Sequence, residues 1–151
     1  MFKKLLPAVI LTLYLYLIMP GETVIKTTCL SEETEEAIVH LVREAVEDTA
    51  WLQASSRGEL ELLLKRYYTG DLLKEICDKA WDFVRIPNCW DYIIKAGKIK
   101  ICYVSGDTAA VSVEVVETDE ITGISYYTQL EYMLLKTDTG WKITARKVLS
   151  V

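Results

Sequence analysis

Beyond the N-terminal segment, apolar residues first recur at the spacing of helices. Ser31 is a favourable N-cap residue, and the glutamates at 32, 33, 35 and 36 suit the positive end of a helix dipole. Apolar side chains then return every three or four positions, which predicts an amphipathic helix over residues 32–54. Its apolar positions include Ile38, Leu41, Val42, Ala45 and Leu52.

Two further helices are predicted next. The first has its apolar stripe between Leu60 and Tyr67 and is expected to end at Gly70, because glycine is favoured just beyond a helix end. The second is expected to begin at Asp71 and to end before Pro87, which has no backbone N–H to give to a helix. Its apolar positions are Leu72, Leu73, Ile76, Ala80, Phe83 and Val84.

After the third helix the apolar period changes to two, the spacing of a strand with one buried face. Four such segments follow one another, separated by turns at Gly106, Gly123 and Gly140. The apolar face is expected to carry Ile99, Ile101 and Tyr103, then Ala109, Val111, Val113 and Val115, then Ile124, Tyr126, Thr128, Leu130, Tyr132 and Leu134, and finally Trp141, Ile143 and Ala145. Consecutive strands joined by tight turns indicate an antiparallel meander.

The opposite face of this sheet is expected to be polar. Charge pairs between neighbouring strands are predicted there, one joining Lys100 to Glu114 and one joining Glu131 to Arg146. The apolar face needs a cover, and the helices supply it. The sequence therefore predicts an α+β fold in which three N-terminal helices pack on a curved four-stranded antiparallel meander, behind a hydrophobic leader.

Residues 1–28 are expected to be this leader, a signal peptide or membrane anchor. Lys3 and Lys4 precede the uncharged segment 5–19, and as a helix this segment measures about 22 Å, less than the roughly 30 Å of a bilayer core. A positive start followed by an apolar run of this length is typical of a secretory signal. Because the lysines should stay in the cytosol, the rest of the chain is expected outside it, either secreted or anchored to the cell membrane.

Several fates of the leader remain open from the sequence. No Ala-x-Ala cleavage site follows it, and the residues before Cys29 differ from those that usually precede a lipid-modified cysteine. An uncleaved anchor is a further alternative. The remaining alternative is that residues 5–19 form a buried first helix of the domain, although their apolar character runs all the way round.

Composition narrows the class of the remaining domain, residues 29–151. The whole chain is 51% apolar and 26% charged, with 22 acidic and 17 basic residues. Removing residues 1–28 leaves 21 acidic and 14 basic residues, a net charge of −7. One globular domain of this charge repels a phosphate backbone, so nucleic acid is not an expected partner.

Metal and disulfide chemistry are also not expected. The spacings of Cys29, Cys77, Cys89 and Cys102 match no disulfide framework, so free thiols are predicted. His40 is the only histidine, and there is no Cys-x-x-Cys pair to help form a zinc site. No cofactor motif is present either.

The strand turns resemble those of one superfamily. The segments that carry the likeness are Gly106-Asp107-Thr108-Ala109-Ala110-Val111 and Gly140-Trp141-Lys142-Ile143, together with Thr122-Gly123 and the 132–136 strand. With helices first and a meander after them, residues 31–151 resemble the cone-shaped fold of the nuclear transport factor 2-like superfamily. The resemblance implies a pocket between a concave sheet and its helices. Its members include isomerases, dehydratases and epoxide hydrolases as well as binding and assembly domains, so the fold does not choose among functions.

Two kinds of site are candidates for such a pocket. An isomerase or lyase would need a carboxylate base with a hydroxyl donor, for which Asp82 or Asp91 with Tyr132 are the weak candidates, and Asp82 falls off the apolar stripe of its helix. A binding site for an apolar ligand would use aromatic walls. The aromatic residues predicted for it are Tyr67, Trp81, Trp90, Tyr103 and Tyr132.

The leading hypothesis is a non-enzymatic extracytoplasmic domain that binds a small apolar molecule or a protein partner. The alternatives are the isomerase or lyase, and a structural component of an envelope assembly that associates through the open face of its sheet. A homodimer is a possible form of that association.

Overall fold

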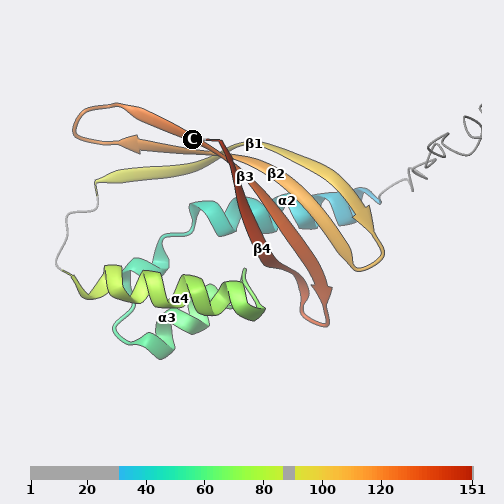
Figure 1. The fold of residues 1–151 in the computed structure, drawn as a ribbon, viewed down its shortest axis with the longest axis horizontal. Coiled ribbons are helices and arrows are strands. Elements are labelled where there is room, and N and C mark those ends of the chain that lie inside the picture. Colours follow the sequence, from blue (N-terminus) through green and yellow to red (C-terminus); the bar gives the residue numbers. More distant parts are fainter. Residues whose placement is uncertain (1–30, 87–90, 151) are drawn as a thin grey trace, which may run out of the picture.

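A computed structural model of the chain describes residues 31–86 and 91–150 (Figure 1). The helices are α2 (Glu32–Glu47), α3 (Arg57–Leu64) and α4 (Gly70–Arg85), with the short 3-10 helix η1 (Ala50–Gln53) after α2. The strands are β1 (Tyr92–Ser105), β2 (Thr108–Asp119), β3 (Ser125–Thr137) and β4 (Gly140–Ser150). Each strand pairs antiparallel with the next, in the order β1-β2-β3-β4. The predicted α+β fold, helices followed by a meander, is confirmed.

The predictions for residues 1–28 fall outside the described residues. Among the helices that the structure describes, none is both long and apolar enough to cross a membrane. The two cysteines in the described part of the chain, Cys77 and Cys102, are free thiols, and only Cys77 is buried.

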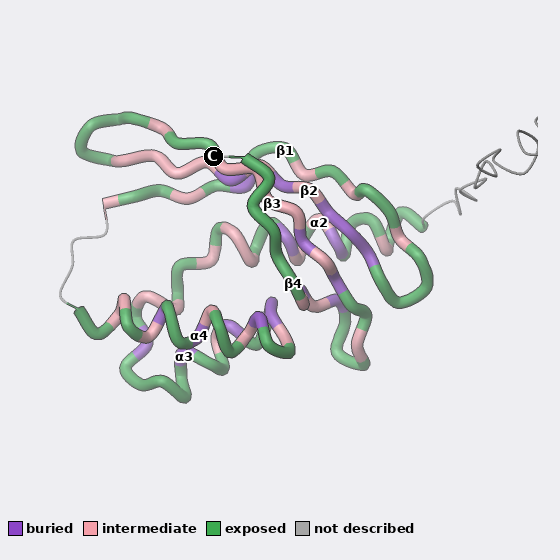
Figure 2. Tube along the Cα trace, viewed as in Figure 1, coloured by how far each residue is buried: buried purple, intermediate pink, exposed green. Residues whose placement is uncertain are grey.

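The core lies between the helices and one face of the sheet, here called the inner face (Figure 2). α2 packs against β1 and β4, and α4 packs against β4. Fully buried side chains come from every layer: Ile38 and Val42 on α2, Leu60 on α3, Val111 and Val113 on β2, Leu134 on β3 and Ile143 on β4. Ile124 and Tyr126, predicted on the apolar face, lie at the turn end of the β2–β3 hairpin and are exposed.

α2 is shorter than the predicted 32–54 helix. Its start is as predicted, since the Ser31 hydroxyl accepts a hydrogen bond from the Thr34 N–H. It ends at Glu47, because the Asp48 backbone is extended and its carboxylate accepts a hydrogen bond from the Ala50 N–H at 2.8 Å. This local bond competes with the helical one and turns the chain into η1.

The boundary between α3 and α4 also differs from the prediction. α3 ends at Leu64, and Gly70, predicted to follow that helix, instead begins α4 with a φ of +65°. The residues between them run beside β4: the Ile143 N–H donates to the Tyr67 carbonyl at 2.8 Å, and the Thr69 N–H donates to the Ile143 carbonyl at 3.0 Å. Tyr67 and Tyr68 are thereby held against the sheet and are buried.

Two irregularities in the sheet overturn predicted side-chain directions. The register shifts between Ile101 and Tyr103, so Tyr103 pairs with Ala110 on the outer face and is 45% exposed. A second shift, between Met133 and Leu134 on β3, moves Arg146 to a position opposite Tyr132. A bulge inserts one residue into one strand, which reverses the alternation beyond it. Arg146 therefore lies on the inner face.

Neither of the two predicted charge pairs is in register across the sheet. Glu131 pairs in register with Lys147, not with Arg146. Lys100 lies opposite Ser112, and Glu114 lies opposite Gln129.

Candidate functional site

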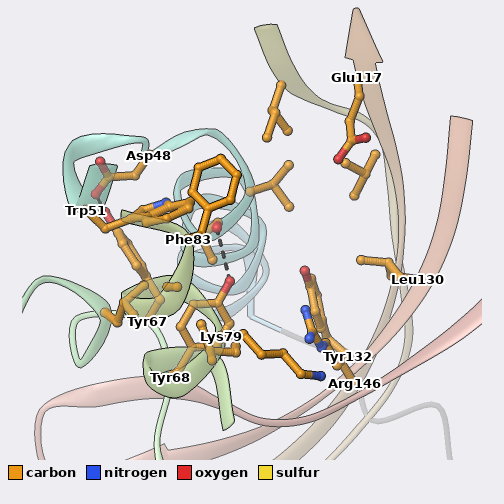
Figure 3. Close-up of a pocket in the computed structure, with 17 residues that line it drawn as sticks. Asp48, Trp51, Tyr67, Tyr68, Lys79, Phe83, Glu117, Leu130, Tyr132 and Arg146 are labelled. Carbon is orange, nitrogen blue, oxygen red and sulfur yellow. Dashed lines mark hydrogen bonds between the residues drawn. The ribbon is translucent and has the colours of Figure 1, made fainter. Parts of the chain in front are cut away.

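A cavity of about 330 Å³ lies between the helices and the inner face of the sheet (Figure 3). Its volume is at the lower end of the range for small-molecule sites. Every helix and strand contributes to its wall. The lining residues are Ala45, Val46, Asp48, Trp51, Leu64, Tyr67, Tyr68, Ile76, Lys79, Ala80, Phe83, Ile94, Val115, Glu117, Leu130, Tyr132 and Arg146.

Aromatic rings from two helical elements form one apolar wall. Trp51 on η1 and Phe83 on α4 have ring centroids 6.2 Å apart and planes tilted by 58°, a favourable arrangement of an aromatic pair. Trp51 reaches this position because the chain turns at Asp48 instead of continuing as α2. Ile94 and Leu130 supply the apolar side chains of the facing sheet.

Two buried tyrosines add hydroxyl groups to this wall. The Tyr68 hydroxyl donates to the Ala45 carbonyl at 3.1 Å, which Figure 3 marks with a dashed line. Burial raises the pKa of Tyr68 well above its usual value, and burial also raises the pKa of Tyr132. Both phenols are therefore neutral at physiological pH and act through hydrogen bonds, not as bases.

Asp48 lines the cavity, and both oxygens of its carboxylate already accept hydrogen bonds. Its Oδ2 atom accepts a hydrogen bond from the Tyr67 hydroxyl at 2.6 Å and pairs with the Arg66 guanidinium at 2.7 Å. Although burial alone raises the pKa of Asp48, hydrogen bonds from Tyr67 and the Ala50 N–H, with the charge of Arg66, outweigh burial and lower it. A carboxylate held in this way is a weak base.

The cations at the cavity are Arg146 on β4 and Lys79 on α4. Lys79 pairs with the Glu75 carboxylate at 2.6 Å, and the same Glu75 oxygen lies 3.5 Å from the Arg146 guanidinium. A separation of 3.5 Å exceeds the usual 2.7–3.2 Å of a hydrogen bond to nitrogen, so the Arg146 pair is weak. Within the described residues, no group of three or more His, Cys, Asp or Glu side chains is arranged to hold a metal ion.

The structure brings only some of the predicted site residues to the cavity. Tyr67 and Tyr132 line it. Trp81 packs against the core without lining the cavity, Tyr103 lies on the outer face, and Trp90 is outside the described residues.

The two carboxylates considered for catalysis lie elsewhere. Asp82 is exposed on α4, and Asp91 is half-buried just before β1; neither lines the cavity. Neither carboxylate is therefore placed in this cavity beside a pocket hydroxyl, as an acid–base pair would require.

Of the lining residues, only Tyr67 and Tyr132 were predicted from the sequence; those missed include Trp51, Tyr68, Phe83 and Arg146. Phe83 belongs to the predicted apolar stripe of its helix, so helical spacing alone places it on the side that packs inward. For Arg146 the sequence was misleading, because simple alternation along the strand placed its side chain on the polar face.

Comparisons with known proteins support the fold. No family model matches the chain, and no curated protein matches it. The intermembrane-space region of the chloroplast protein ARC6 superposes with a TM-score of 0.51 at 20% identity, covering 81% of this chain and 98% of that one. An NTF2-like protein with a cystatin-like fold from Novosphingobium aromaticivorans superposes with a TM-score of 0.51 at 14% identity, covering 96% and 89%. Identities this low show a shared nuclear transport factor 2-like fold alone.

Proposed function

We propose that this domain is a binding domain, and that a small, largely apolar molecule occupies the cavity between the helices and the sheet. The observation that carries the proposal is the cavity itself, with Trp51 and Phe83 on one side and Leu130 on the other. Apolar walls with a few polar groups are the usual composition of small-molecule sites. The carboxylates considered for catalysis do not line this cavity, which favours binding over the isomerase or lyase alternative.

Filling the cavity is expected to abolish binding. In the variant Ala45→Phe a benzyl group would extend from α2 into the space that the ligand needs, since Ala45 lines the cavity and is half-buried. The neutral fluorescent probe N-phenyl-1-naphthylamine, whose emission rises in apolar surroundings, is expected to bind the variant at least about tenfold more weakly, a change of about 1.4 kcal/mol. Fluorescence titration of the full chain measures this change.

The matched control is Ala37→Phe, which adds the same group at an exposed position of the same helix. It is expected to leave the affinity unchanged, and thermal unfolding of both variants checks that they fold. Equal probe affinities in wild type, Ala45→Phe and Ala37→Phe would show that the probe binds elsewhere, and the proposal would fail.

We also propose that the domain works outside the cytosol, secreted or anchored to the membrane through residues 1–28. The support is the leader pattern in the sequence, two lysines followed by an uncharged run. Fractionation of cells that express the tagged full chain is expected to place it in the membrane or exported fraction. Removal of residues 1–28 is expected to move it to the soluble cytosol, and a wild-type chain found only there would refute the export proposal.

A further inference from the structure

Arg146 is the feature of the cavity that an apolar ligand alone does not explain. Its side chain is 38% exposed and faces the helices from β4, because the strand irregularity near Met133 turns it inward. Its carboxylate partner, Glu75, is 3.5 Å away and is shared with Lys79, which is closer at 2.6 Å. The guanidinium thus keeps most of its hydrogen-bonding capacity for another acceptor, since it carries five N–H donors.

The neighbours of Arg146 suit a bound anion. Tyr132 lies directly across from it in the sheet, and the charge of Arg146 acts on the pKa of Tyr132, so the two side chains are close (Figure 3). The Tyr68 hydroxyl gives its proton to the Ala45 carbonyl and also interacts with the Tyr132 hydroxyl, so Tyr132 belongs to a small hydroxyl network beside Arg146. A guanidinium beside a neutral phenol offers an anionic oxygen charge-assisted hydrogen bonds.

The two carboxylates that line the cavity, Asp48 and Glu117, lie away from this end, where Glu75 is already paired with Lys79. The charge of Asp48 is balanced by Arg66, and its carboxylate accepts a hydrogen bond from Tyr67. Val111 on β2 pairs with Tyr132 and so marks the Arg146 end of the cavity. Glu117 lies six residues further along β2, and at about 3.3 Å per residue it is roughly 20 Å from that end. The cavity therefore has a cationic end and an acidic end, with apolar walls between them.

We propose that the ligand is a small apolar monocarboxylate whose carboxylate binds Arg146 and accepts a hydrogen bond from Tyr132. Its apolar body lies toward Trp51 and Phe83. A carboxylate fits better than a single-atom anion, because two parallel N–H groups of arginine match its two oxygens. This inference rests on the proposed function, since it names the class of ligand for the same cavity.

The test compares compounds that share shape and differ in charge. Three pairs are titrated into the full chain by calorimetry: cyclohexanecarboxylate and its amide, 2-naphthoate and its amide, and decanoate and its amide. At least one carboxylate is expected to bind wild type about tenfold or more tightly than its amide. Arg146→Gln is expected to reduce that preference to less than about twofold, mainly by weakening carboxylate binding, whereas Arg146→Lys restores part of it.

The matched control is Lys147→Gln, which removes a neighbouring cation on the outer face of the same strand. It is expected to preserve the wild-type preference, so loss of the preference in both variants would indicate a general effect of net charge and overturn the assignment to Arg146. Equal binding of each carboxylate and its amide would overturn the carboxylate inference while the binding cavity stands. Binding of none of the six compounds, and of no N-phenyl-1-naphthylamine, would overturn the proposed function itself.

Discussion

The free energy of unfolding is expected to fall by about 2–5 kcal/mol when Ile143 is replaced by alanine. Ile143 is fully buried at the centre of the core, where α4 packs against β4. Removing its side chain leaves a void that close-packed neighbours fill only in part. The same residue holds the Tyr67–Thr69 segment through its backbone N–H and carbonyl. Equilibrium urea unfolding measures the loss.

A control on the same strand separates core packing from strand propensity. Val148→Ala shortens a side chain that is 54% exposed and is expected to change stability by no more than about 0.5 kcal/mol. The account of the core would be contradicted if Ile143→Ala and Val148→Ala had equal effects.

Replacing Asp48 with alanine is expected to cost about 1–3 kcal/mol of stability. The Asp48 side chain is only 20% exposed, and the substitution removes the hydrogen bonds from Tyr67 and Ala50 and the ion pair with Arg66. Burial, together with the bond to Asp48, raises the pKa of Tyr67 to about 12, so Tyr67 stays a donor at neutral pH and loses its acceptor. Asp82→Ala removes an exposed carboxylate of equal charge and is expected to be nearly neutral.

The cost of Asp48→Ala is expected to depend on pH. The folded-state pKa of Asp48 lies below its ordinary value, because hydrogen bonds and the Arg66 charge outweigh burial, so the charged form is favoured by folding. This contribution is present above the unfolded-state pKa and is lost as the pH falls through the folded-state value. The stability difference between wild type and variant, measured by urea unfolding from pH 7 down to pH 3, should therefore shrink at the acid end. A difference that grows toward low pH would contradict the assigned hydrogen bonds.

The fold could be predicted because it depends on periodicity, which a sequence displays directly. The change from helical spacing to alternation after the third helix marks where the sheet begins, and Gly106, Gly123 and Gly140 mark its turns. Each of these glycines adopts a positive φ that other residues rarely take.

The site was harder to predict because local irregularities determine it. Alternation alone placed Tyr103 inward and Arg146 outward, and one shift in strand register reversed each assignment. Helical spacing alone extended α2 through Trp51, whereas the side chain of Asp48 ends the helix and turns Trp51 toward the cavity. In each case one inserted residue or one side-chain hydrogen bond overrides a pattern that is correct for its neighbours.

Tyr68 illustrates a different reason. It falls at the end of the helix predicted to stop at Gly70, outside the apolar positions predicted for that helix. It lines the cavity because its segment pairs with Ile143, 75 residues further along the chain. A contact of this sequence separation leaves no local trace in the chain, so only the folded structure reveals it.

Two-dimensional NMR of the isotope-labelled full chain, titrated with the tightest-binding compound, tests the central claim most directly. If the cavity between helices and sheet is the binding site, shift changes will concentrate at the Trp51 indole, Ala80, Leu130 and Arg146, and the outer face around Tyr103 will stay unchanged. Changes confined to the outer face, or their absence from the cavity at saturating ligand, would contradict it.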